Sequence, residues 1–326
     1  MKIPSIVDLQ VNGFVNVSFS AEELTADDFA RACRELLNRA CSAFLVTVIT
    51  SPRQVYQRNL PLMAAVMKRE EFRGRVLGFH IEGPFISPVD GARGAHDARW
   101  VCKPDIPFFD DIIAWGDGLV RMITIAADAE GSEDLARHAV SRGITVALGH
   151  HLAKSADLER LVQAGAKALT HLGNGVPAML PRHENPIWAG LANDDLTASL
   201  ITDGNHLPPD VIKVFLRTKG VARCIVVSDA APLAGMPPGK YQTLGNDVIL
   251  EPGGRLYNPA TGYMVGSSAT MLKCMNHLAS LELLKPEELA QVGFYNPLRL
   301  IGMDPTAVRP LRPLTLDETR NEFRFE

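Results

Sequence analysis

The chain has 326 residues, of which 46% are hydrophobic and 21% charged, and its formal net charge is −4. This composition is typical of a globular protein with a large apolar core, and the lack of a basic excess argues against nucleic acid as a partner. No run approaches the roughly 20 apolar residues of a membrane span, and the start of the chain lacks a signal-peptide pattern. Five cysteines without paired spacing favour reduced thiols. We therefore expect a cytoplasmic protein without membrane contact.

Eight short apolar runs begin near residues 5, 43, 75, 120, 144, 166, 196 and 222, and most are followed by an amphipathic stretch. Strands that alternate with helices predict a parallel sheet covered on both faces, which explains why the runs are almost continuously apolar. Eight such units predict an α/β fold, a (β/α)8 barrel of the TIM type. A doubly wound open sheet is the alternative, but no GxGxxG motif follows the first run.

A segment rich in glycine and proline, residues 232–262, follows the eighth run. We expect a hairpin-like excursion there, and the sequence leaves open whether it forms a lid. Helices are expected within 267–279 and 285–302. The whole chain, 1–326, is therefore predicted to be a single barrel domain.

Titratable side chains stand at or just after the ends of five of the apolar runs: Glu82, His150, His171, His206 and Asp229. Any one of them alone is more often a structural hydrogen-bonding group than a functional residue. The active sites of (β/α)8 barrels, however, lie at the carboxyl ends of the strands, where side chains distant in sequence converge. Five such residues at the same end of five strands predict one shared site.

Glu82, His150 and His171 together offer one carboxylate oxygen and two imidazole nitrogens. Three protein ligands with one open position are typical of a catalytic zinc site, although the same set also suits Fe²⁺. A divalent cation would also explain a carboxylate at the end of a buried strand, since an unpaired buried charge is costly. Gln10 and Asn12, on the first run, are neutral amides that bind such metals weakly, so we expect one metal ion.

Several segments, in this order, carry a resemblance to a known family: DLQVNG, GFHIEGPFIS, GARGAHD, ALGHH, THLGNGVP, ITDGNHLPP, VVSDA, GSSATM and NPLRLIGM, from residue 8 to 303. The chain resembles the N-acetylglucosamine-6-phosphate deacetylases of the amidohydrolase superfamily. The resemblance implies a hydrolase that removes the acetyl group of N-acetylglucosamine 6-phosphate, or of a close amino-sugar phosphate, by attack of metal-activated water.

The same resemblance implies a role for each matching residue. Glu82, His150 and His171 would be the metal ligands and Asp229 the catalytic acid and base. His96 would donate a hydrogen bond to the acetamide carbonyl. The sugar and its phosphate would be bordered by His206, Asn174 and the backbone at Gly175.

The chain departs from the family pattern in two places. Where the family has HLFNAMP or HLYNAMP, this chain has HLGNGVP, and the family's REPG is replaced by PRHENP. The family arginine that reaches the phosphate from the neighbouring subunit of a homodimer would then be either Arg182 or absent, with His183 as a substitute. These changes leave open a deacylase for another N-acyl substrate without phosphate. A non-catalytic metal-binding barrel and a barrel enzyme without metal are further alternatives.

A third difference is architectural. Family members carry a small β-sandwich built from segments before and after the barrel. Here the first apolar run begins near residue 5, and only residues 304–326 follow the NPLRLIGM segment. We therefore expect the β-sandwich to be absent or vestigial.

Overall fold

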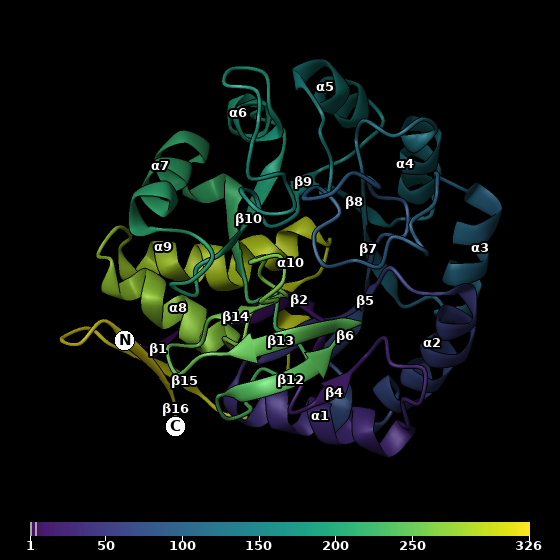
Figure 1. Ribbon diagram of the computed structural model, residues 1–326. Coiled ribbons are helices and arrows are strands. Elements are labelled where there is room, and N and C mark those ends of the chain that lie inside the picture. Colours follow the sequence, from purple (N-terminus) through teal and green to yellow (C-terminus); the bar gives the residue numbers. More distant parts are fainter. Residues whose placement is uncertain (1, 4) are drawn as a thin grey trace.

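The computed structural model describes residues 2–3 and 5–326, and an eight-stranded parallel sheet forms its centre (Figure 1). The neighbouring strands pair in chain order, as an α/β barrel requires. They are β2 (Val7–Val11), β5 (Ala43–Ile49), β6 (Val76–Glu82), β7 (Val120–Ile125), β8 (Thr145–Leu148), β9 (Ala168–Leu169), β10 (Thr197–Ile201) and β11 (Cys224–Val227). Each strand lies within one of the eight predicted runs.

The sheet closes between its first and last strands. Val11 forms a parallel bridge with Ala230, and the Asn12 N–H donates to the Ala230 carbonyl at 2.8 Å. The sheet is thus a nearly closed barrel, which confirms the predicted TIM-type fold.

Helices surround the barrel and connect its strands (Figure 1). They are α1 (Ala26–Arg39), α2 (Arg53–Met67), α3 (Ile106–Trp115), α4 (Ser132–Ser141), α5 (Ser155–Gln163), α6 (Pro186–Ala192), α7 (Pro209–Lys219) and α8 (Met271–Ser280). The segment predicted as a helix over 285–302 is helical without a break, as α9 (Pro286–Ala290), a π-helical turn (Gln291–Tyr295) and α10 (Asn296–Leu300). Leu298 and Phe294 from this segment pack into the apolar interior of the barrel.

The alternation of side chains along β6 decides where its polar residues point. After an irregularity in the register near Gly78, Phe79 and Ile81 belong to the core between the strands and the helices. Successive side chains of a strand face opposite sides. His80 and Glu82 therefore face the barrel interior, and Glu82 does so at the carboxyl end of the strand.

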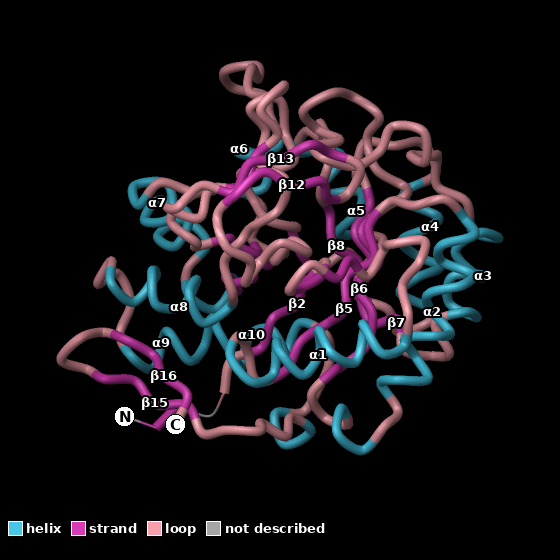
Figure 2. Tube along the Cα trace, turned by 60° about the horizontal axis from the view of Figure 1, so that its bottom comes forward, coloured by secondary structure: helices cyan, strands magenta, loops and turns pink. Residues whose placement is uncertain are grey.

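Three smaller sheets complete the structure (Figure 2). After β11 the chain forms β12 (Gly239–Thr243), β13 (Asn246–Leu250) and β14 (Leu256–Tyr257), an antiparallel sheet within the segment predicted as an excursion. Near the two chain ends, β1 (Lys2–Ile3), β15 (Leu314–Asp317) and β16 (Glu322–Phe325) form a small antiparallel sheet. The β-sandwich of the family is expected to be absent or vestigial in these end regions, and this expectation stays a prediction. The third sheet is the pair β3 (Gly13–Phe14) and β4 (Val17–Ser18). None of the described helices is long and apolar enough to cross a membrane.

Candidate active site

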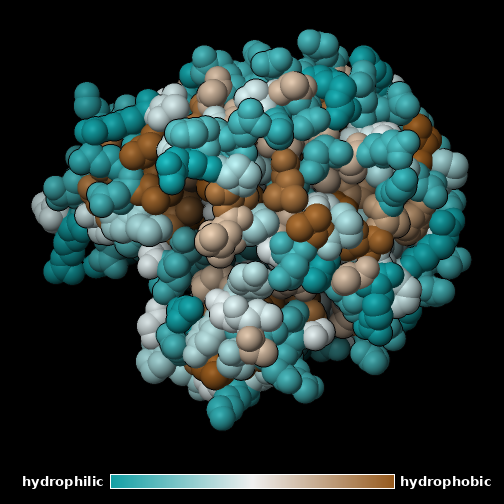
Figure 3. Space-filling model, turned by 45° about the horizontal axis from the view of Figure 1, so that its top comes forward, coloured by the Kyte–Doolittle hydropathy of each residue, from teal (hydrophilic) through white to brown (hydrophobic). Residues whose placement is uncertain are grey.

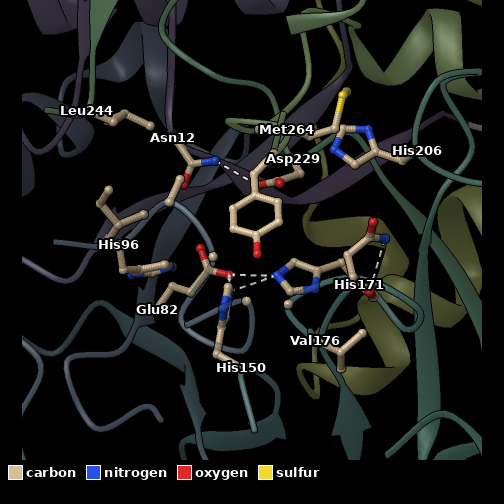
Figure 4. Close-up of a pocket in the computed structure, with 18 of the residues that line it drawn as sticks. Asn12, Glu82, His96, His150, His171, Val176, His206, Asp229, Leu244 and Met264 are labelled. Carbon is tan, nitrogen blue, oxygen red and sulfur yellow. Dashed lines mark hydrogen bonds and ion pairs between the residues drawn. The ribbon is translucent and has the colours of Figure 1, made fainter. Parts of the chain in front are cut away.

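A cavity opens at the carboxyl ends of the barrel strands, and eight of the ten residues proposed from the sequence line it (Figure 4). They are Glu82, His96, His150, His171, Asn174, Gly175, His206 and Asp229. Arg182 and His183 do not line it. Among the described residues, the cavity lining contains no arginine and no lysine.

Three of these residues have an unusual backbone conformation. His150, His171 and Asp229 each follow a barrel strand with a positive φ, at 51°, 33° and 51°. This left-handed region costs a non-glycine residue on the order of 1–3 kcal/mol, and such strain concentrates at functional sites. The three strands therefore turn sharply at the residues that face the cavity.

The side chains of Glu82, His150 and His171 converge on one point (Figure 4). Glu82 Oε1 lies 3.3 Å from His150 Nε2 and 3.1 Å from His171 Nε2. The two Nε2 atoms are 3.0 Å apart, and all three side chains are buried. Burial on its own raises the pKa of the Glu82 carboxyl, but hydrogen bonds with His150 and His171 outweigh it and hold that pKa well below its ordinary value.

The hydrogen bonds around this cluster fit a cation better than a proton. His150 Nδ1 lies 2.9 Å from the Ala92 carbonyl oxygen, which can only accept, so Nδ1 carries the hydrogen. Nε2 of the same ring faces Glu82 Oε1 and His171 Nε2. A carboxylate oxygen and two imidazole nitrogens that face one another in a buried site are the donor set of a divalent metal ion.

Two amide side chains of and just after strand β2 hydrogen-bond to acidic residues of the site, but neither is a proposed metal ligand. Gln10 Nε2 donates to Glu82 Oε1 at 2.8 Å, and Asn12 Nδ2 donates to Asp229 Oδ1 at 2.7 Å. Both amides face acidic side chains as hydrogen-bond donors. The expectation of one metal ion remains a prediction, and this geometry agrees with it.

Asp229 follows the last barrel strand and is partly buried beside the cluster. Burial raises the pKa of its carboxyl to about 6, and the negative charge of Glu82 acts in the same direction. A carboxylate with a raised pKa near the operating pH is suited to accept a proton and return it.

His96 faces the cavity from the loop after β6, and its ring packs edge-on against His150, with centroids 4.4 Å apart. Burial and the neighbouring His150 lower the pKa of His96 to about 3, so the ring is neutral. Its Nδ1 lies 2.8 Å from Thr50 Oγ1. If the Thr50 hydroxyl donates to Nδ1, the ring hydrogen resides on Nε2, where His96 can donate to a carbonyl oxygen.

Replacing Thr50 with valine tests this assignment. We expect Thr50→Val to lower kcat about tenfold, because the Nε2–H tautomer of His96 is no longer favoured and part of an oxyanion donor is lost. Thr50→Ser, which keeps the hydroxyl, should retain most of the wild-type rate. Equal rates for Thr50→Val and wild type would show that Thr50 does not set the tautomer.

His206 is held by an acidic side chain that the sequence did not single out. Its Nδ1 lies 2.8 Å from Asp203 Oδ2, which also accepts the Ser267 hydroxyl at 2.6 Å. Asp203 Oδ1 accepts the backbone N–H of His206 at 2.8 Å. Burial opposes ionisation of Asp203, yet the hydrogen bond and charge of His206 outweigh it and keep the pKa of Asp203 low. Nδ1–H of His206 thus donates to Asp203, and Nε2, at the other side of the ring, has no hydrogen-bond partner among the described residues.

The loop after β9 brings backbone close to the proposed ligands. Gly175 has a φ of 62°, and a Cβ atom there would lie 3.0 Å from His150 Nδ1. Glycine therefore suits both the conformation and the space at this position. Asn174 also donates its side-chain amide to the His171 carbonyl, at 3.2 Å. This loop is fixed against the metal-ligand cluster.

The loop then continues away from the cavity. Arg182 and His183 have exposed side chains. The Arg182 carbonyl accepts a hydrogen bond from Trp188 Nε1 at 3.0 Å. Within one copy of the chain these two residues are not part of the cavity.

Sequence reasoning missed Thr50, Asp203, Ser267 and Tyr263, of which Tyr263 lines the cavity. Thr50 does stand directly after a predicted strand, and the motif ITDGNH includes Asp203. These positions in the sequence could have identified Thr50 and Asp203 as site residues.

No family model matches the chain, but individual proteins do. The N-acetylglucosamine-6-phosphate deacetylase of Bos taurus is 33% identical over 314 residues, covering 92% of this chain and 74% of that protein. The N-acetylgalactosamine-6-phosphate deacetylase of Escherichia coli O157:H7 is 26% identical, covering 92% of this chain and 78% of that protein.

Among solved structures, a mutant of N-acetyl-D-glucosamine-6-phosphate deacetylase from Mycobacterium smegmatis, in complex with N-acetyl-D-glucosamine 6-phosphate, matches with a TM-score of 0.87 and 26% identity. The match covers 98% of this chain and 84% of that one. With a relative at 33% identity that is covered over 74% of its length, the chain belongs to the N-acetylglucosamine-6-phosphate deacetylase family.

Proposed function

We propose that the protein is a metal-dependent hydrolase that converts N-acetylglucosamine 6-phosphate and water into glucosamine 6-phosphate and acetate. The observation that carries the proposal is the convergence of Glu82, His150 and His171 next to Asp229 and His96 in one cavity of a chain from this family. A barrel enzyme without metal would leave the convergence of one carboxylate and two imidazoles at a buried point unexplained.

Glu82, His150 and His171 would hold one divalent cation, for which Zn²⁺ is our first choice and Fe²⁺ the alternative. The bound cation supplies Lewis acidity that polarises the acetyl carbonyl and makes a water molecule a stronger acid. The preference for zinc follows from a set of two imidazoles and one carboxylate, which is typical of catalytic zinc sites.

Asp229 acts as the base and then as the acid. Because Asn12 occupies Oδ1, the Oδ2 atom of Asp229 takes the proton as water attacks the acetyl carbon. The same atom then delivers that proton to the amide nitrogen when the C–N bond breaks, since an amine cannot leave as an anion. His96 donates its Nε2–H to the oxygen that gains negative charge.

The sugar phosphate lies against His206, Asn174 and the backbone at Gly175. The cavity itself contributes no arginine or lysine among the described residues, so we propose a homodimer in which Arg182 of the second copy meets the phosphate. Exposed apolar side chains on the same segment support such a contact, since Met179 is 91% and Trp188 52% exposed. The face shown in Figure 3 is largely hydrophilic, with brown hydrophobic patches at its left and across its centre.

Arg182→Ala tests the phosphate assignment. We expect the KM for N-acetylglucosamine 6-phosphate to rise about 10- to 100-fold with kcat little changed, because one charge-assisted hydrogen bond is lost. Turnover of unphosphorylated N-acetylglucosamine should not change. His183→Ala tests the substitute phosphate-binding residue in the same way, and light scattering reports the oligomeric state. An unchanged KM in Arg182→Ala would remove Arg182 from the phosphate site.

The activity itself is tested by acetate release from the zinc-loaded protein. N-acetylglucosamine 6-phosphate, N-acetylgalactosamine 6-phosphate and N-acetylglucosamine serve as parallel substrates. We expect the highest kcat/KM for the first of the three. Turnover without any preference for phosphate would contradict the proposed substrate, and no acetate release from any of them would contradict the proposed deacetylation of amino sugars.

A further inference from the structure

Asn12, the residue after β2, is fixed by its backbone and points into the active site. Its N–H donates to the Ala230 carbonyl at 2.8 Å, and its own carbonyl accepts the Phe19 N–H at 3.1 Å. The residue is only 4% exposed, yet it lines the cavity. These backbone hydrogen bonds therefore fix the position from which the Asn12 side chain extends into the site.

The two ends of the Asn12 amide have different environments. Nδ2 donates to Asp229 Oδ1 at 2.7 Å, and an ionised carboxylate can only accept, so the nitrogen must be the atom that faces Asp229. The amide oxygen Oδ1 then points away from Asp229 (Figure 4). This oxygen is buried and has no hydrogen-bond partner among the described residues. An unpaired buried acceptor is costly, and in a cavity a bound molecule can satisfy it.

The neighbouring amide on the same strand differs in this respect. Gln10 Nε2 donates to Glu82 Oε1 at 2.8 Å, but Gln10 does not line the cavity. Gln10 can orient a metal ligand without reaching substrate. Both amides donate to an acidic side chain, but only Asn12 also lines the cavity, and its amide oxygen has no partner among the described residues.

We propose that Asn12 binds the substrate, with its Oδ1 accepting the acetamide N–H while its Nδ2 orients Asp229. The inference rests on the proposed function, because the acetamide is the group that brings one N–H donor to this place. Holding that N–H on Asn12 turns the nitrogen so that the lone pair formed as the carbonyl is attacked faces Asp229. One amide side chain thus aligns both partners of the proton transfer that releases the amine.

The experiment compares two substrates in several variants. One substrate is N-acetylglucosamine 6-phosphate, and the other is its ester analogue, 2-O-acetylglucose 6-phosphate, in which oxygen replaces the N–H. Asn12→Leu removes both ends of the amide at similar volume, whereas Asn12→Asp keeps an acceptor oxygen but replaces the donor to Asp229 with a second carboxylate oxygen. Gln10→Leu is the matched control on the same strand. Asn12→Ala replaces Asn12→Leu if that variant does not fold, as judged by thermal melting.

The readout is the ratio of kcat/KM for the amide to that for the ester. We expect this ratio to fall at least about tenfold in Asn12→Leu, since the buried N–H of the amide loses its acceptor. Asn12→Asp and Gln10→Leu should lose rate on both substrates and keep a ratio near wild type. An unchanged ratio in Asn12→Leu, with the amide still hydrolysed by wild type, would overturn this inference alone. No amide hydrolysis by wild type would overturn the proposed function as well.

Discussion

Asp229→Asn is expected to lower kcat about 100- to 10,000-fold, the range that a positioned general acid and base contributes. The amide of asparagine keeps the volume of the side chain but has no carboxylate to accept the proton of water. Asparagine also tolerates the left-handed φ of 51° found at this position, so the backbone should not change. Steady-state acetate release measures the loss.

Two controls distinguish a loss of catalysis from a loss of folding or of bound metal. The melting temperature and the bound metal of Asp229→Asn should match those of wild type, because Asp229 is not one of the three proposed ligands. Near-wild-type turnover by a folded, metal-loaded Asp229→Asn protein would show that another group moves the proton.

The pH dependence of kcat/KM gives a second test of the role of Asp229. The pKa of Asp229 is raised to about 6 by burial and by the negative charge of Glu82, and a bound cation would counter the effect of Glu82. The carboxylate form is the active base, so kcat/KM should fall as the pH drops through a value at or below about 6. That acid limb should be absent from the residual activity of Asp229→Asn.

His150→Asn is expected to lose metal, and the adjacent His151→Asn to keep it. Ligand removal should weaken metal binding by at least about 100-fold, more than the 10- to 100-fold typical of residues that only support a ligand. Asparagine suits the left-handed φ of 51° at position 150. Activity of His150→Asn should fall in proportion to its metal content.

His151 is a matched control because it is buried as deeply but lies outside the cavity. Its Nδ1 accepts the Ala153 N–H at 3.1 Å, and burial lowers its pKa to about 4, so it is a neutral structural side chain. Metal content after dialysis distinguishes the two variants. Equal metal retention by His150→Asn and His151→Asn would show that the metal, if bound, lies elsewhere.

The sequence predicted the barrel because a parallel sheet covered by helices is buried on both faces. Its strands then appear as continuous apolar runs, and β5 (Ala43–Ile49) is buried at every position. The same logic located Glu82, His150 and Asp229, since a titratable residue at or just after the end of such a run stands at the barrel mouth. These predictions needed only local patterns and the connection rule of the fold.

The partners of these residues could not be predicted in the same way. Thr50 contacts His96 across 46 positions of sequence, and Ser267 contacts Asp203 across 64. Such pairs depend on where loops are placed after the barrel has formed, and no periodicity records that. The two hydroxyls are chemically ordinary in the sequence and acquire their importance from burial beside a charged or titratable group.

The helix predicted over 285–302 is present from residue 286 to 300, but its π-helical middle could not be predicted, for a related reason. Its composition suits a helix, but the segment must also close the bottom of the barrel, and Phe294 and Leu298 both reach the apolar interior there. A π-helical turn at Gln291–Tyr295 separates the two short helices. Tertiary packing, which the local pattern does not contain, thus decides the path of this segment.

The central claim is that one cation held by Glu82, His150 and His171 makes this barrel a deacetylase. Titrating metal-free protein with zinc while following acetate release from N-acetylglucosamine 6-phosphate tests it most directly. The account predicts that activity rises linearly and saturates at about one zinc ion per chain, and that Glu82→Gln abolishes the rise. Full activity without added metal, or saturation only at two ions per chain, would contradict it.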